Sequence, residues 1–93
     1  MFEDNTVVIG CSHVTSCDVG DGVALLNLEA GVYFGINDVG ARVWALMEKP
    51  VSFNAICSTI AEEFDVSYSV CRSDLSDLMI SMMEHGLIEA IRE

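Results

Sequence analysis

Residues 25–44 read LLNLEAGVYFGINDVGARVW and predict a β-hairpin that leads directly into a helix. Apolar side chains occupy alternate positions on both sides of a Glu-Ala-Gly turn, which is typical of two paired strands. We therefore expect an antiparallel hairpin of residues 23–28 and 32–36. Asn37 or Asp38 can cap the helix that follows, and Val43 and Trp44 then lie on its buried face.

Helices dominate the second half of the chain. The predicted helices cover residues 38–48, 52–64 and 68–85, and a short strand-like segment follows at residues 87–91. Lys49-Pro50 ends the first helix because the residue before a proline avoids helical geometry. Ser52 is the expected N-cap of the second helix, and Gly86 is suited to a left-handed C-cap after the third.

A further strand is expected near the N-terminus. Residues 6–12 alternate around Val7, Ile9 and Cys11, whereas residues 15–22, rich in Asp and Gly, are predicted as a loop. With the hairpin, residues 6–12 give a sheet of the smallest size expected to be stable when a helix covers one face. The predicted fold class is α+β: a winged-helix-like domain with a three-stranded antiparallel sheet followed by three helices.

Length and charge limit the classes of function. The 93 residues are enough for one domain, residues 1–93. Four Lys and Arg against 15 Asp and Glu give a formal charge of -11, which repels phosphate backbones and disfavours nucleic acid as a partner. Apolar runs are shorter than the roughly 20 residues of a membrane helix. With no signal-peptide pattern, we expect a cytoplasmic protein without a membrane partner.

Catalytic motifs are absent from the sequence. It has no Gly-rich phosphate loop, no nucleophile elbow and no paired carboxylates in a recognisable pocket motif. His85 falls in the last turn of a predicted helix, where a capping role suits it. We expect no catalytic residue, no cofactor and no enzymatic activity.

The four cysteines form no Cys-x-x-Cys pair. Buried free thiols are the simpler interpretation, because a free cysteine packs like a small apolar residue. Cys11, His13 and Cys17 offer three possible zinc ligands, but a structural zinc site needs four and no fourth is evident. We therefore predict no metal.

The third predicted helix has a wider apolar arc than core packing requires. The stripe expected to dock the helix consists of Cys71, Leu75, Leu78 and Met82. The adjoining flank consists of Arg72, Ser76, Met79, Ile80 and Met83. This flank has two interpretations, a wider core contact or a methionine-rich binding surface.

The second hairpin strand, residues 32–36, is expected to end as an edge of the sheet. An edge strand leaves backbone groups unpaired and accepts a further strand. Gly35 inside this strand indicates close approach of another backbone. A bulge, or space for Trp44, is the alternative interpretation.

Residues 33–44, YFGINDVGARVW, form part of a longer pattern. Its downstream parts are Phe53, Ile56, Ile60, Phe64-Asp65-Val66 and Glu84-His85-Gly86-Leu87-Ile88. Over roughly residues 23–91 this pattern resembles the PqqD family. The resemblance implies a small chaperone, a RiPP recognition element, that binds the leader segment of a ribosomally made precursor peptide.

The same resemblance implies where the leader binds. It would add as a strand beside the second hairpin strand and bury side chains against the third helix, so that the two form the walls of one groove. The implied leader-binding residues are Val32, Tyr33, Phe34, Gly35, Ile36, Arg72, Leu75, Ser76, Met79, Ile80 and Met83. Asp74 and Asp77 are either solvated or select leaders that carry Lys or Arg.

The implied partners are the precursor peptide and an enzyme that processes it. A lasso leader peptidase and cyclase fit a free-standing chain of this length better than a radical SAM or other modifying enzyme. A winged-helix regulator is disfavoured because the third helix sets Arg72 against Asp74, Asp77 and Glu84. A small metal-binding or redox protein built on the Cys and His residues is the other alternative.

Overall fold

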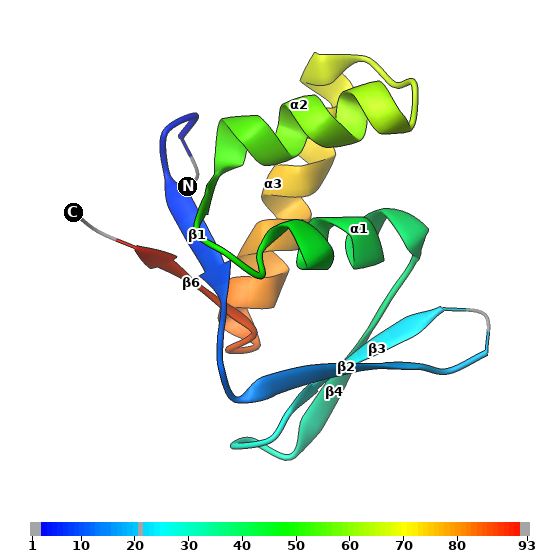
Figure 1. The fold of residues 1–93 in the computed structure, drawn as a ribbon, viewed down its shortest axis with the longest axis vertical. Helices are drawn as coiled ribbons and strands as arrows, with labels where there is room; N and C mark the ends of the chain where they lie inside the picture. The colour runs from blue at the N-terminus through cyan, green and yellow to red at the C-terminus, as the bar shows by residue number, and fades with distance from the viewer. Residues whose placement is uncertain (1–2, 21, 92–93) are drawn as a thin grey trace.

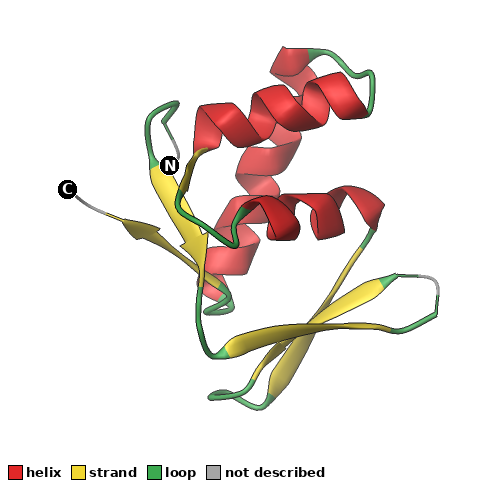
Figure 2. Cartoon of the chain, viewed as in Figure 1, coloured by secondary structure: helices red, strands yellow, loops and turns green. Residues whose placement is uncertain are grey.

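The computed structural model describes residues 3–20 and 22–91. Figures 1 and 2 show the helices gathered on one side of a twisted hairpin sheet. The elements are β1 (Val7–Gly10), β2 (Val14–Asp18), β3 (Val23–Asn27), β4 (Val32–Ile36), α1 (Asp38–Leu46), β5 (Val51–Ser52), α2 (Phe53–Glu63), α3 (Tyr68–Glu84) and β6 (Ile88–Ile91). Helix α2 packs against both α1 and α3.

The strands form two small antiparallel sheets. In one sheet β3 lies between β2 and β4, and in the other β1 lies between β5 and β6. Val7 pairs with Ile91 and Gly10 with Ile88, so the two ends of the described chain lie side by side, as the blue β1 and red β6 of Figure 1 show.

The single three-stranded sheet expected from the sequence is therefore wrong in its first strand. Residues 6–12 contribute β1 to the other sheet, and the predicted loop at 15–22 contributes β2. Most of the β2 side chains are exposed, so alternation of apolar residues is missing there. The backbone ladder to β3 holds β2 in place. The partners of β1 are β5, in the middle of the chain, and β6, at its far end, and such distant pairing leaves no local signature.

The three predicted helices and their caps are confirmed. The Asn37 side chain accepts a hydrogen bond from Gly40 N at 2.9 Å, and the Ser52 hydroxyl accepts one from Ala55 N at 3.1 Å. Gly86 has φ +71 and follows the last turn of α3, a backbone conformation that favours glycine.

One apolar core joins the helices to both sheets. Its fully buried members include Val8, Leu25, Val43, Phe53, Ile56, Met79 and Met82. Trp44 is half-buried and packs against this core. A Cβ atom on Gly10 would lie 2.7 Å from Cη2 of Trp44, so the glycine in β1 gives the indole its space.

Candidate functional site

Strand β4 forms an edge of its sheet. It pairs with β3 on one side, and no described residue pairs with it on the other. In an antiparallel ladder, alternate residues of an edge strand turn their N–H and C=O groups outward. Tyr33 is 74% exposed and Val32 46%, whereas Ile36 is buried. The predicted free edge is confirmed.

Gly35 lies in open space. It pairs with Ala24 in an uninterrupted register, so β4 has no bulge there. A Cβ atom on Gly35 would meet no atom within 4 Å, and Trp44 takes its space at Gly10 instead. Both alternative interpretations of Gly35 are wrong, and the surface of β4 is accessible at this point.

The hairpin is anchored to the end of α3 by Asn27, a residue that none of the sequence patterns above indicated. Asn27 is only 5% exposed. Its Nδ2 donates to the carbonyl of His85 at 3.0 Å, and its Oδ1 accepts from the backbone of Glu29 and Ala30 at 3.1 and 3.0 Å. A polar side chain at a core-facing strand position directly before a turn is the signal that points to it.

An aromatic contact joins β4 to the same end of α3. The ring centroids of Phe34 and His85 are 4.9 Å apart, and the ring planes are tilted by 56°. His85 is the C-cap of α3, and its Nδ1 lies 2.7 Å from the carbonyl oxygen of Ser81. The predicted capping role of His85 is confirmed, and β4 approaches α3 on the side of Ser81 and His85.

That side of α3 is not the one predicted to face β4. At about 100° per residue, Arg72, Ser76 and Met83 lie roughly 140–180° around the helix axis from Ser81 and His85. At the end of α3 the predicted flank thus points away from the side that contacts β4, and a groove between β4 and that flank stays a prediction. At the same helical spacing, Asp74, Leu78 and Ser81 lie on the side of α3 that carries His85.

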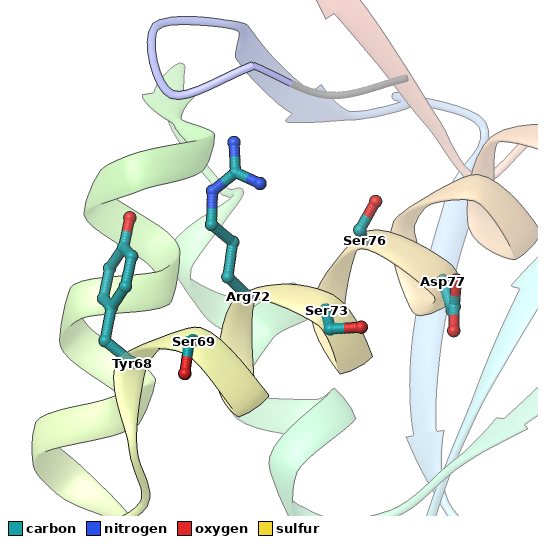
Figure 3. A pocket seen from close by; sticks show the side chains of 6 residues that line it. All are labelled: Tyr68, Ser69, Arg72, Ser73, Ser76 and Asp77. Atoms are coloured by element: carbon teal, nitrogen blue, oxygen red, sulfur yellow. The ribbon is translucent and has the colours of Figure 1, made fainter.

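The N-terminal segment faces the flank that carries Arg72. Arg72 Nε donates to the carboxylate of Asp4 at 3.0 Å, and the guanidinium lies 5.3 Å from the centre of the Phe53 ring. The hydrogen bond to Asp4 raises the pKa of Arg72. Figure 3 shows the open pocket on this side, which is lined by Tyr68, Ser69, Arg72, Ser73, Ser76 and Asp77.

The apolar members of the predicted flank belong mainly to the core. Met79 is 0% exposed, and Leu75 of the docking stripe is 3% exposed, so Met79 does not lie on an open surface as the implied leader contact requires. Ile80 is half-buried against the core, and Met83 is 37% exposed. Leu78, expected in the docking stripe, is only half-buried. The wide apolar arc is thus largely a wider core contact, because α3 packs against both α2 and β6.

The cysteines are free thiols in different environments. Cys57 and Cys71 are buried where α2 meets α3, and Cys71 Sγ lies 3.6 Å from the carbonyl oxygen of Cys57. Burial raises the pKa of Cys57 to about 11, which makes it a poor nucleophile at neutral pH. Cys17 is exposed. Within residues 3–20 and 22–91, no group of three or more His, Cys, Asp or Glu side chains could hold a metal ion.

Comparison with known proteins identifies the family. Residues 22–88 match the family model of coenzyme PQQ synthesis protein D (PqqD). The chain belongs to the PqqD family. Domains of this family are non-catalytic peptide-recognition modules. No curated protein matches the chain, and none of its described helices has the length and apolar character needed to cross a membrane.

Solved structures share the fold over nearly the whole chain. TbiB1, solved in complex with the TbiA(beta) leader peptide, is 30% identical, with 91% of this chain and 99% of that chain covered and a TM-score of 0.78. Lasso peptide synthetase B1, solved with its leader peptide, is 20% identical, with 88% and 96% covered and a TM-score of 0.75. The PqqD part of Methylobacterium extorquens PqqCD, a stand-alone RiPP recognition element, is 15% identical, with 96% and 95% covered and a TM-score of 0.80.

Proposed function

We propose that this PqqD-family chain binds the leader of a ribosomally made precursor peptide as an added strand on β4. The observation that carries the proposal is the unpaired edge of β4, held against the end of α3 by Asn27 and by the contact of Phe34 with His85. The binding of a leader peptide by TbiB1, at 30% identity, supports it.

Strand addition suits the chemistry of this edge. The outward N–H and C=O groups of β4 would pair with the leader main chain, and side chains of the leader at alternate positions would supply specificity. The ladder to β3 already fixes the β4 backbone, so the ordering cost of binding falls mainly on the leader. Side chains of the leader that point inward would meet the α3 side that carries Leu78 and Ser81.

This arrangement divides the leader-binding residues implied by the resemblance into three groups, of which Leu75, Met79 and Ile80 belong to the core or pack against it. The residues of β4 stay in the proposal, with Val32, Tyr33 and Gly35 exposed at the edge. Arg72, Ser76 and Met83 lie on the other side of α3. Leader contact on that side is the alternative to contact with Leu78, and substitutions at Leu78 and Met83 distinguish the two.

The biological consequence would be tethering. A bound leader raises the effective concentration of the precursor at a partner enzyme without new contacts to the reacting residues. We propose a lasso leader peptidase and cyclase as the enzymes, acting in the cytoplasm, with a radical SAM or other modifying enzyme as the alternative. Reading frames beside the gene distinguish the two, since a lasso pathway places a short precursor, a peptidase and a cyclase there.

Fluorescence anisotropy tests the binding step directly. The two probes are labelled synthetic peptides, one covering the N-terminal half of whichever short precursor the neighbouring reading frames encode and the other being the TbiA(beta) leader. We expect saturable binding of at least the first probe at a Kd of about 1 μM or tighter. A scrambled peptide of the same composition is the control. Equal binding of the scrambled peptide and both probes would reject leader recognition.

A further inference from the structure

Asn27 is the one buried polar or charged residue among residues 3–20 and 22–91. The two halves of its amide have different partners. Oδ1 accepts from the turn, at Glu29 N and Ala30 N, while Nδ2 donates across to α3, at the carbonyl of His85 at 3.0 Å and that of Gly86 at 3.5 Å. One side chain thus shapes the hairpin turn and fastens it to the helix.

Three parts of the chain meet at this side chain. The ring of His13, from the β1–β2 connection, lies with Nε2 3.0 Å from the carbonyl oxygen of Gly86, and the His13 carbonyl accepts from Leu28 N at 2.9 Å. The fit is close, because a Cβ atom on Gly86 would lie 3.0 Å from Nδ2 of Asn27. The carbonyls at the end of α3 carry the partial negative charge of a helix C-terminus, so this position requires a donor.

We propose that Asn27 is a positioning residue for leader binding, which sets the separation between the free edge of β4 and the Ser81 side of α3 before the leader arrives. This inference rests on the proposed function. In this proposal Asn27 does not contact the leader, and it acts only through the placement of β4. A site formed in advance avoids the cost of ordering the hairpin on binding.

The variant Asn27→Asp separates the two halves of the amide. The introduced carboxylate still accepts from the turn N–H groups, but it places an oxygen against the two carbonyls where Nδ2 donated. Asn54→Asp is the matched control, since it makes the same charge change at the start of α2. The Tyr68 hydroxyl donates to Asn54 Oδ1 at 2.5 Å, and an aspartate still accepts that bond.

Placement of the hairpin is measured in the free protein. The ring of Phe34 shifts the His85 ring proton resonances by its ring current, so undocking moves them toward solvent values. We expect Asn27→Asp to move these resonances and to speed amide exchange in β4. Trp44 packs beside Gly10, so its fluorescence reports separately that the core is folded.

Leader affinity is measured with the same two labelled probes. We expect Asn27→Asp to weaken binding by about tenfold or more, the scale of a lost hot-spot contribution, and Asn54→Asp to leave it unchanged.

Equal affinity of Asn27→Asp and Asn54→Asp, with the His85 resonances displaced in the former, would overturn the positioning role. If Asn27→Asp loses the folded Trp44 signal, Asn27→Ser replaces it, because serine is uncharged and too short to reach α3. If the wild-type chain binds neither probe, the proposed function fails. In that case the His85 ring proton resonances and amide exchange in β4 still test whether Asn27 positions β4. If neither signal changes in either Asn27 variant, the positioning role is rejected.

Discussion

The two sides of α3 are covered by different parts of the chain and in different ways. On one side Arg72 reaches the exposed Asp4 of the N-terminal segment, through a pair in which both side chains remain substantially exposed. On the other side the hairpin is held by the buried amide of Asn27 and by the contact of Phe34 with His85. The width of the apolar arc on a helix therefore indicates how much of the helix other parts of the chain cover. It does not indicate which side contacts a ligand.

The two attachments differ in strength for a physical reason. A half-exposed ion pair is screened by water and salt and contributes little net free energy. A buried amide with satisfied donors and acceptors cannot be broken without leaving polar groups unpaired, at a cost of about 1–3 kcal/mol. We expect the N-terminal cover to be the looser one and the placement of β4 to be the firmer.

The largest expected effect comes from a charge at the centre of α3. Met79→Glu should lower the free energy of unfolding by about 3–5 kcal/mol, because Met79 is fully buried and a carboxylate placed there would lose its hydration. Met83→Glu, at a partly exposed position, should change it by about 0.5 kcal/mol or less. Denaturant unfolding measures both. Equal stability of the two variants would contradict the orientation of α3 in the structure, in which Met79 faces the core and Met83 is partly exposed.

Local features of the fold were predictable because their causes lie within a few residues. The hairpin turn, the caps at Asn37, Ser52 and Gly86, and all three helices follow from patterns of that kind. The place of β2 was not predictable, since its exposed side chains carry no alternation and a ladder to β3 defines it. The pairing of β1 with β6 depends on contacts between chain ends.

The candidate site also has a part that was predictable from local sequence and a part that was not. The free edge at residues 32–36 followed from its position after a hairpin turn. The side of α3 that faces this edge could not be predicted. A helical pattern gives the width of the apolar arc, whereas the packing of α3 against α2, β4 and β6 determines which neighbour each side of the helix meets. The role of Asn27 could not be predicted for a related reason: its partners on α3 lie far along the chain.

Hydrogen exchange compares the two edges of the hairpin sheet. If the leader adds to β4, amide exchange at residues 32–36 should slow by up to about a hundredfold at a probe concentration of 100 times Kd. Strand β2, the other edge, should change little, and β1 should not change because β5 and β6 already flank it. Protection concentrated in α2 would instead show that the peptide binds as a helix.

Substitutions on α3 distinguish its two sides as leader contacts. Leu78→Asp places a charge on the side of α3 that carries Ser81 and His85, and it should weaken leader binding by about 1–3 kcal/mol, the scale of a lost interface anchor. Met83→Glu carries the same kind of change on the opposite side and should leave affinity unchanged. Anisotropy titrations of folded variants make the comparison, and the reverse ranking would move the leader to the Met83 side.

A side chain at Gly35 tests how closely the leader approaches β4. Gly35→Val should change the free energy of unfolding by about 0.5 kcal/mol or less, because the added atoms meet open space and valine favours strands. Affinity for the leader should fall by more than stability does, since the branched side chain would crowd the side chains of an added leader strand on the same face of the sheet. Affinity retained in full would mean that the leader does not pass this point.

The smallest effect is expected from Arg72, which the resemblance to the PqqD family placed in the leader site. Arg72→Gln removes the ion pair with Asp4 and the contact with Phe53, so the unfolding midpoint should fall slightly, and less so at high salt. Asp4→Asn breaks the same pair from the other side and should reproduce that change. Leader affinity should stay within about twofold for both variants, because neither residue lies near β4 and an exposed pair contributes little. A large loss of affinity in Arg72→Gln but not in Asp4→Asn would show that the guanidinium itself contacts the leader, and it would make the side of α3 covered by the N-terminal segment the recognition surface.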